Sequence, residues 1–153
     1  MKDKLPFGFD TPQDSPGFLL WQTTLTWQRL IKKTLQPFDV SHAQFVIMAL
    51  LMWLDGQGVE TTQVHIVQWS KLDKMTVSKA LKSLASLGYV TRTEHRQDTR
   101  AKSVKLTSSG RVLIQKLVPL VEKCDEAFFK GIKKGDQKNL MEFLKELIGD
   151  KGQ

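Results

Sequence analysis

Two short helical segments separated by three residues are the feature that most restricts how this chain can fold. The first follows Thr62, over about residues 63–69, and Asp73 caps the second, which runs to the helix-stopping Gly88. Apolar residues recur at helical spacing along one face of the second segment, and its opposite face is polar. A helix, a tight turn and an amphipathic helix form a helix-turn-helix, so the sequence predicts a mainly α-helical fold built around this unit.

A β-hairpin is expected directly after the second helix. Residues 89–93 and 101–106 both alternate in a way that favours β-strands, and the polar stretch 94–100 separates them. A hairpin in this position is the wing of a winged helix-turn-helix. The tip of the wing is expected to be charged.

Two helices are expected before this unit. Residues 15–36 begin with a Ser-Pro cap and have an amphipathic pattern. A capping box at Ser41 opens the next helix, which is apolar all round from Phe45 to Leu54 and is expected to be buried at the centre of the core.

Two more helices are expected after the hairpin, which gives six in all. Thr107 and Ser108 cap a long helix that keeps its apolar rhythm to about residue 132. Pro119 lies inside this helix and is expected to remove one hydrogen bond and bend it. The last helix is expected to begin at Asp136.

The composition fits one domain and excludes several classes of protein. At 153 residues the chain is 41% hydrophobic and 25% charged, as ordinary globular proteins are. Its longest apolar run, Phe45 to Leu54, is shorter than the roughly 18 residues of a membrane span, and the N-terminal residues lack the apolar segment of a secretory signal. We therefore expect a cytoplasmic protein with no membrane contact, made of an N-terminal arm, residues 1–14, and a single domain, residues 15–150.

Positive charge is concentrated around the predicted helix-turn-helix. The chain has a net charge of +7. Between Lys71 and Lys105 there are nine Lys or Arg residues and three Asp or Glu residues, so this stretch carries +6 and the rest of the chain +1. A solvated lysine-rich face would have spread its charge along the chain, whereas a patch favours a polyanion partner such as double-stranded DNA.

The polar face of the helix after Asp73 has the side chains of a recognition helix. Small hydroxyl groups can approach base edges or phosphates, methionine can touch a thymine methyl group, and lysine reaches phosphates or guanine. Arginines at the wing tip would lie beside the duplex, where a narrow minor groove attracts them. The predicted DNA contacts are Lys74, Met75, Thr76, Ser78, Lys79 and Lys82 in the helix and Arg96, Arg100 and Lys102 in the wing.

Nearly the whole chain resembles the MarR (multiple-antibiotic-resistance regulator) family of winged helix-turn-helix repressors. The matching stretches are Ser41 to Phe45, Asp73 to Ser78, Leu84 to Val90, Asp98 to Ala101 and Leu106 to Gly110. The most specific part is the Asp-x-Arg of the wing followed by Leu-Thr-x-x-Gly. The resemblance implies an obligate homodimer that binds a pseudo-palindromic operator.

The same resemblance gives roles to two wing residues. In such proteins the arginine at the Arg100 position enters the minor groove, and the aspartate at the Asp98 position orients it. From the residues alone, Asp98 and Arg100 are equally a surface ion pair of little energetic weight. The resemblance also divides the domain into dimerisation helices, residues 15–36 and 107–150, and a DNA-binding lobe, residues 41–106.

Family members often respond to small phenolic or carboxylic ligands bound where the first two helices meet the long helix before the last one. Side chains that would line such an apolar pocket here are Trp21, Met48, Met52 and Trp53. In the alternative that stays open, these side chains fill the core and the dimer interface.

The sequence contains no motif for catalysis or metal binding. It has no phosphate-binding Gly-rich loop and no nucleophile elbow, and His42, His65 and His95 lack ligand spacing. Cys124 follows the apolar rhythm of its helix, where a buried thiol is inert. We expect no enzyme, cofactor or metal site. Two alternatives to a DNA-binding regulator stay open: a winged helix that binds another protein, and one that binds structured RNA by shape.

Overall fold

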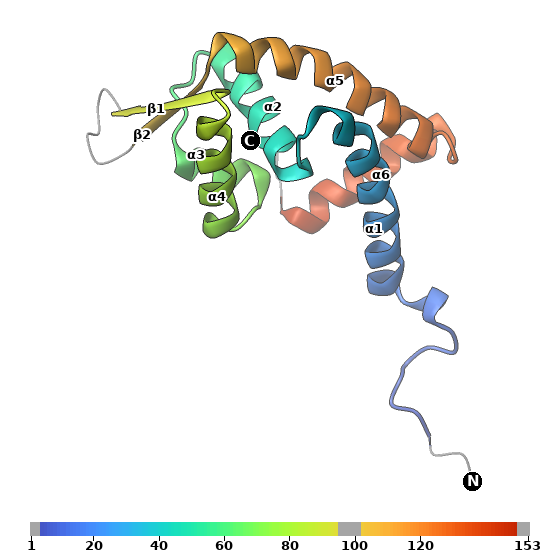
Figure 1. Ribbon diagram of the computed structural model, residues 1–153. Helices are drawn as coiled ribbons and strands as arrows, with labels where there is room; N and C mark the ends of the chain where they lie inside the picture. The colour runs from blue at the N-terminus through green and yellow to red at the C-terminus, as the bar shows by residue number, and fades with distance from the viewer. Residues whose placement is uncertain (1–3, 95–101, 150–153) are drawn as a thin grey trace.

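The computed structural model describes residues 4–94 and 102–149 and shows a mainly α-helical fold with one two-stranded hairpin (Figure 1). The elements of this described part are η1 Pro12–Asp14, α1 Pro16–Leu35, η2 Gln36–Phe38, α2 His42–Gly56, α3 Gln63–Ser70, α4 Lys74–Ser86, β1 Val90–Glu94, β2 Lys102–Leu106, α5 Ser108–Phe129 and α6 Lys134–Ile148. The predicted winged helix-turn-helix, with six α-helices in the described residues, is therefore confirmed.

Side-chain caps begin the central helices at the residues expected from the sequence. The Ser41 hydroxyl accepts the N–H of Gln44 at 3.1 Å, and the Gln44 side chain accepts the N–H of Ser41 at 2.9 Å. Thr62 and Asp73 cap α3 and α4 by accepting the N–H of the third residue of each helix. These bonds satisfy donors that a helix N-terminus otherwise leaves unpaired, so the start of each helix is fixed locally.

Helix α2 runs through the centre of the core, with α1, α3, α4 and α5 packed around it. The prediction that α2 is buried all round is only partly right, since Trp53 on this helix is 52% exposed. α6 contributes no buried side chain. The largest fully buried apolar side chains are Ile31, Leu35, Ile47, Met48, Ile66, Val77, Leu81, Leu84, Ile114 and Leu117.

The wing is joined to the body of the lobe through an isolated β-bridge between Thr62 and Ser103. β1 and β2 pair antiparallel, with Arg92 opposite Val104. On the other side of β2, the N–H of Val104 donates to the carbonyl oxygen of Thr61 at 2.8 Å. The buried Ser103 hydroxyl donates to Glu60 Oε1 at 2.6 Å. The base of the wing is thus fixed by hydrogen bonds on both sides of β2.

The first turn of α5 is held against the turn that ends α4. The Thr107 hydroxyl donates to the carbonyl oxygen of Gly88 at 2.6 Å, and the Thr107 N–H donates to that of Tyr89 at 3.0 Å. Gly88 has a φ of +79°, a conformation that favours glycine. Gly110 lies so close to the same turn that a Cβ built on it would be 2.1 Å from the Tyr89 oxygen. The Leu-Thr-x-x-Gly stretch therefore holds the first turn of α5 against the end of α4 and the start of the wing.

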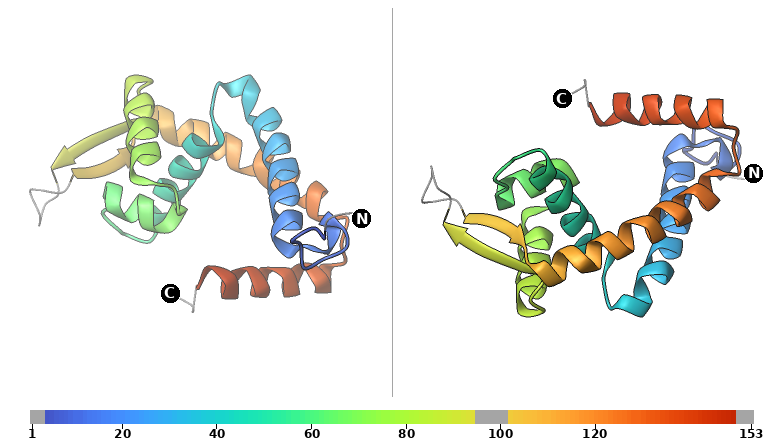
Figure 2. Two further views of the ribbon diagram at one scale, coloured as in Figure 1. Left: turned by 90° about the horizontal axis from the view of Figure 1, so that it is seen from below. Right: turned by 90° about the horizontal axis from the view of Figure 1, so that it is seen from above.

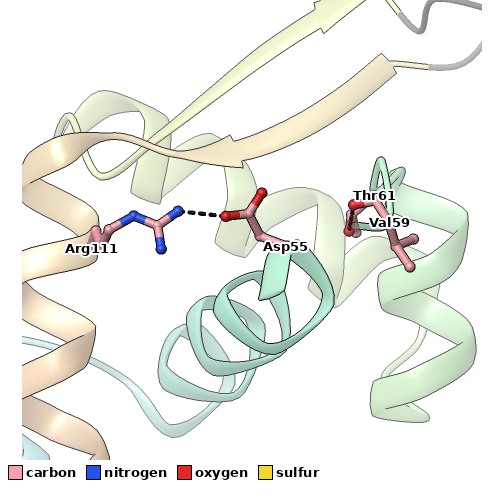
Figure 3. Close-up of polar contacts among 4 residues, drawn as sticks. All are labelled: Asp55, Val59, Thr61 and Arg111. Atoms are coloured by element: carbon pink, nitrogen blue, oxygen red, sulfur yellow. Dashed lines mark hydrogen bonds and ion pairs between the residues drawn. The ribbon is translucent and has the colours of Figure 1, made fainter. Parts of the chain in front are cut away.

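An ion pair links α5 to α2 (Figure 3). Arg111 Nη2 lies 2.7 Å from Asp55 Oδ2. The two side chains are 43% and 58% exposed, so the pair contributes at most about 1 kcal/mol. At the end of the turn beyond α2, the Thr61 hydroxyl donates to the Val59 carbonyl oxygen at 3.5 Å.

Helix α5 connects the wing at one end of the molecule to α1 and α6 at the other (Figures 1 and 2). It continues through the exposed Pro119 as a single helix, which Figure 2 shows as curved and unbroken. The predicted start of α6 at Asp136 is wrong by two residues, because the helix begins at Lys134. Its N-cap residue, Lys133, makes no side-chain cap, so the usual signal for a helix start is missing.

No single helix within residues 4–94 and 102–149 is both long enough and apolar enough to cross a membrane. The segments Pro16–Phe38 and His42–Gly56 are long and apolar enough only when taken together, and they are bent by 80° relative to each other.

Candidate nucleic-acid interface

Helix α4 has one face in the core and one face in solvent. Val77, Leu81 and Leu84 are fully buried and hold the helix against α2. The opposite face carries exposed residues at intervals of three and four, so they form one row along the helix. The row consists of Met75, Ser78, Lys79, Lys82 and Ser86, with Lys74 exposed at its start. Four of the six predicted DNA contacts on this helix therefore lie side by side.

Thr76 is placed differently from the other predicted contacts. It is half-buried, and its hydroxyl donates to Asp73 Oδ2 at 2.7 Å while its N–H donates to Asp73 Oδ1 at 2.8 Å. These two hydrogen bonds, that of the backbone N–H first, lower the pKa of the Asp73 carboxyl. The hydroxyl proton of Thr76 is thus used inside the protein, and only its oxygen lone pairs remain for a base edge.

A cleft of about 580 Å³ lies between α3, the start of α4 and the wing. Three cationic side chains from three elements meet there: Lys74 of α4, Arg92 of β1 and Lys102 of β2. The other lining residues are Thr62, Gln63, Val64, Val67, Gln68 and Val104. Such a cleft beside the exposed face of α4 suits a sugar-phosphate backbone, whose oxygens are the main targets of Lys and Arg side chains.

Arg92 lies in this cleft but was not among the DNA contacts predicted from the sequence. It belongs to the charged stretch, but its position in a predicted strand gave no sign of the direction of its side chain. The pairing of β1 with β2 decides that direction. Of the predicted wing contacts, Lys102 is exposed at the start of β2, while Arg96, Asp98 and Arg100 lie outside the described residues.

The chain is similar in sequence and in structure to known regulators. Residues 36–123 match the family described as ArnR1-like, winged-helix domain. The HTH-type transcriptional regulator YdcH of Bacillus subtilis (strain 168) is 36% identical over 140 residues, which cover 92% of this chain and 94% of the relative. The fold is similar to BpsR of Bordetella bronchiseptica, with a TM-score of 0.82, 23% identity and coverage of 92% and 97%. A mutant MarR of Escherichia coli complexed with operator DNA gives a TM-score of 0.76, 24% identity and coverage of 86% and 91%.

The chain belongs to the MarR family. The two solved structures, at less than 25% identity, establish the fold, and the family match and the Bacillus subtilis relative establish the function class. The protein is a DNA-binding transcriptional regulator with a winged helix-turn-helix. The family resemblance and the function class expected from the sequence are both confirmed.

The four side chains predicted to line a ligand pocket in this MarR-family regulator have different surroundings. Met48 is fully buried in the core, and Met52 packs at its margin. Trp21 on α1 is 61% exposed. Trp53 lies against Trp69 of α3, with ring centroids 5.3 Å apart. The ligand site that these residues were expected to make stays a prediction.

A polar cluster at the junction of α1, α2 and α5 was not expected from the sequence. Trp27 Nε1 donates to Asp125 Oδ1 at 2.7 Å, and the Trp27 ring meets the His42 ring edge-on at 5.0 Å between centroids. Burial lowers the pKa of His42, and the negative charge of Asp125 opposes this effect. The cluster joins α1 and α5 to the first turn of α2.

The His42 environment makes the stability of the folded protein depend on pH. Because its pKa is lower in the folded chain than in the unfolded chain, unfolding takes up a proton, so stability should fall as pH drops from about 7 to 5. The slope will be well below the roughly 1.4 kcal/mol per pH unit of a full proton, since His42 is half-buried. Thermal unfolding of the intact chain and of His42→Gln measures this: the variant should show a flatter pH dependence, and identical slopes would contradict the assignment.

His65 and Cys124 have side chains that could bind a metal ion or be oxidised, but one belongs to a helix cap and the other lies at the margin of the core. His65 Nδ1 accepts the N–H of Thr62 at 3.2 Å as part of the α3 cap. Cys124 is a half-buried free thiol at the margin of the core, less buried than its apolar rhythm predicts. Among the described residues no group of three or more His, Cys, Asp or Glu side chains is placed to hold a metal ion.

Proposed function

We propose that this MarR-family regulator is a repressor that acts in the cytoplasm as a homodimer on a pseudo-palindromic operator. One observation carries the proposal: the exposed row of α4 lies beside a cleft with three cationic side chains at the base of the wing. Two copies related by a two-fold axis would place two such surfaces on successive major grooves, which is why the operator should be a palindrome.

Different residues of this surface have different tasks in the proposed complex. Met75 and Ser78, near the start of α4, face the bases, where a methyl contact and a hydroxyl hydrogen bond depend on sequence. Lys79 and Lys82 lie further along and hold phosphates. The cations of the cleft, including Arg92, hold the backbone that passes between the helix and the wing.

We expect the wing tip to contribute to binding without contributing to folding. Arg100→Ala should weaken operator binding about tenfold, or about 1.4 kcal/mol, because an arginine in a narrow minor groove gains from its negative potential. Asp98→Ala should have a smaller effect of the same sign, since Asp98 only orients Arg100. Binding titrations and thermal unfolding measure the two properties. Arg29→Ala, on the exposed surface of α1, is the matched control, and equal affinities of Arg100→Ala and the intact chain would exclude the role.

The homodimer is supported by apolar surface that one chain leaves exposed. α6 has no buried residue, yet Phe143, Leu147 and Ile148 on it are 60%, 77% and 59% exposed. At the same end of the molecule α1 exposes Leu20 and Trp21 (Figure 2). Large apolar side chains exposed in this number indicate an interaction site, and in a symmetric dimer the same surface of each copy covers the other.

Sedimentation of the purified protein tests the dimer directly. The expected species has twice the chain mass of 17.5 kDa at micromolar concentration and below, because burial of two α6 helices is worth many kcal/mol. Leu147→Ser should shift the equilibrium towards the single chain. A monomer at micromolar concentration would contradict the proposal.

Control by a small ligand is the second part of the proposed function. The neighbour BpsR is regulated in its DNA binding by 6-hydroxynicotinic acid, and we propose that a small aromatic or carboxylic ligand likewise releases this regulator from its operator. The predicted site comprises Trp21, Met48, Met52 and Trp53. Since Trp21 is exposed on α1 and Met48 is buried in the core, this site would draw on both copies of the dimer.

The two alternative functions give different binding results. A module that binds structured RNA by shape would prefer an RNA hairpin to the operator duplex, and a protein-binding module would show little salt dependence with any nucleic acid. Membership of a family of DNA-binding regulators favours operator DNA. A promoter fusion then determines the sign of regulation: repression predicts higher expression when the regulator is deleted.

A further inference from the structure

The side chain of Gln44 connects the start of α2 to the exposed side of α4. Its Oε1 accepts the N–H of Ser41 at 2.9 Å, and its Nε2 donates to the Ser83 hydroxyl oxygen at 3.1 Å. The first bond fixes the direction of the amide group, because a backbone N–H can donate to the amide oxygen and not to its nitrogen. Nε2 therefore faces Ser83, and the Ser83 oxygen is the acceptor of the second bond.

This bond leaves the hydroxyl proton of Ser83 available to a partner outside the chain. A hydroxyl group has one proton and two lone pairs, and Gln44 occupies one lone pair. The hydroxyls of Thr26 and Thr34 donate back to the carbonyl oxygen four residues earlier in their helix. The exposed Ser83 has no such acceptor within residues 4–94 and 102–149. Ser83 thus presents a hydrogen-bond donor at the surface of α4.

Ser83 lies at the edge of the exposed row of α4 and in the second half of the helix. It follows Lys79 by four residues, so the two side chains are neighbours on the helix surface. The first residues of a recognition helix contact base edges, whereas most hydrogen bonds to DNA go to phosphate and sugar oxygens. A donor this far along the helix, next to a lysine, suits a phosphate oxygen, which can only accept.

Thr76 lies along the same edge of α4, two turns earlier, and has the opposite arrangement. Its hydroxyl proton is donated to Asp73 Oδ2. Thr76 therefore offers only lone pairs to DNA, which a phosphate oxygen cannot use. Ser83 accepts a hydrogen bond from its own chain and keeps its proton for the DNA. Of these two hydroxyls, Ser83 is the one with the chemistry of a phosphate contact.

We propose that Ser83 is a further DNA contact of this regulator, which donates its hydroxyl proton to a phosphate oxygen, and that Gln44 is the positioning residue for this donor. The inference rests on the proposed contact of the exposed row of α4 with DNA and adds one residue and its support to it. In the complex, three hydrogen bonds run in one direction, from the Ser41 N–H through Gln44 and Ser83 to the phosphate. Each bond polarises the next donor, which strengthens the bond to DNA.

Binding titrations of the full chain on a random-sequence duplex at several salt concentrations test the contact. Ser83→Ala should weaken binding about tenfold, as loss of a hydrogen bond to a charged group does. The slope of the log-log salt dependence should stay unchanged, because a neutral hydroxyl releases no counterion, whereas Lys79→Ala lowers the slope. The operator mapped by footprinting should lose affinity by the same factor, since every duplex carries the same phosphates.

Two substitutions of Gln44 test its positioning role. Gln44→Met removes both bonds of the amide. Gln44→Glu keeps the acceptor for the Ser41 N–H, as a capping box does with either residue, but it replaces the donor with an oxygen that takes the Ser83 proton. Each should weaken binding about threefold or more, and by a smaller factor when combined with Ser83→Ala, since the effect passes through that hydroxyl. Gln57→Met, exposed at the other end of α2, is the matched control and should bind as the intact chain does.

The outcomes separate the contact, the positioning role and the proposed function. Unchanged affinity of Ser83→Ala for both duplexes would overturn the contact, and a loss confined to the operator would do so too, because it would indicate a base as the partner. Equal effects of the Gln44 variants with and without the Ser83 hydroxyl would overturn the positioning role, and a lower melting temperature alone would not support it. Failure of the intact chain to bind either duplex would instead contradict the proposed function.

Discussion

Replacing Gly110 with alanine should lower the free energy of unfolding by about 3 kcal/mol and the melting temperature by roughly 10 °C. The new Cβ would lie 2.1 Å from the carbonyl oxygen and 2.9 Å from the carbonyl carbon of Tyr89. Both are backbone atoms that also hold Thr107, so no side chain can rotate away. The first turn of α5 must separate from the end of α4, and the wing base moves with it.

A second glycine gives the matched control for this prediction. Gly135 lies in the first turn of α6, and a Cβ added to it would have no neighbouring atom within 4 Å. Gly135→Ala should be neutral or raise the stability by up to about 1 kcal/mol, since alanine loses less chain entropy than glycine in a helix. Chemical or thermal unfolding measures both variants, and equal stability of Gly110→Ala and the intact chain would contradict the close approach.

Substitutions on α4 should change DNA binding in two distinct ways. Ser78→Ala should cost on the order of 1 to 3 kcal/mol on the operator and much less on random DNA, if its exposed hydroxyl meets a base edge. Lys79→Ala and Lys82→Ala should each weaken binding to all duplexes alike and lower the slope of the log-log salt dependence by about 0.9 per lost phosphate contact. Titrations of operator and random duplexes at several salt concentrations separate the two effects.

Thr76 needs a different interpretation from Ser78. Its hydroxyl donates to Asp73 within the cap of α4, so Thr76→Ala should lower the stability of the protein as well as its affinity for DNA. A loss of operator affinity in this variant therefore does not by itself show a base contact. The alternative is that α4 makes only electrostatic contacts with DNA. In that case the alanine variants of Thr76, Ser78, Lys79 and Lys82 would all reduce operator binding and random-duplex binding equally.

The sequence predicted the fold well wherever the signal was local. Ser41, Thr62 and Asp73 form the caps that their patterns indicate, and α4 turns the expected face to the core. The start of α6 was missed because Asp136 looks like a cap but lies in the first turn, after a residue without a capping side chain. α5 continues through Pro119, as its apolar rhythm predicts, because Ile114, Leu117 and Val121 on both sides of the proline are buried in the core and offset its cost.

The site was predictable only in part, because contacts between distant segments leave no local pattern. The exposed row of α4 follows from helical spacing. The hydrogen bond from Trp27 to Asp125 spans 98 positions of the sequence, and the pairing of Trp53 with Trp69 depends on how α2 and α3 cross. Helical spacing places each of these residues on its own helix, but it does not show which residues of other helices it meets.

The most direct test of sequence-specific DNA recognition by this regulator is a binding titration of the intact protein. Its operator, mapped by a footprint of the intergenic region upstream of its own gene, is compared with a random duplex of the same length at several salt concentrations. We expect the operator to bind at least about a thousandfold more tightly than the random duplex at physiological salt, with protection of two half-sites about one helical turn apart. Equal affinity for the two duplexes at every salt concentration would contradict sequence-specific recognition.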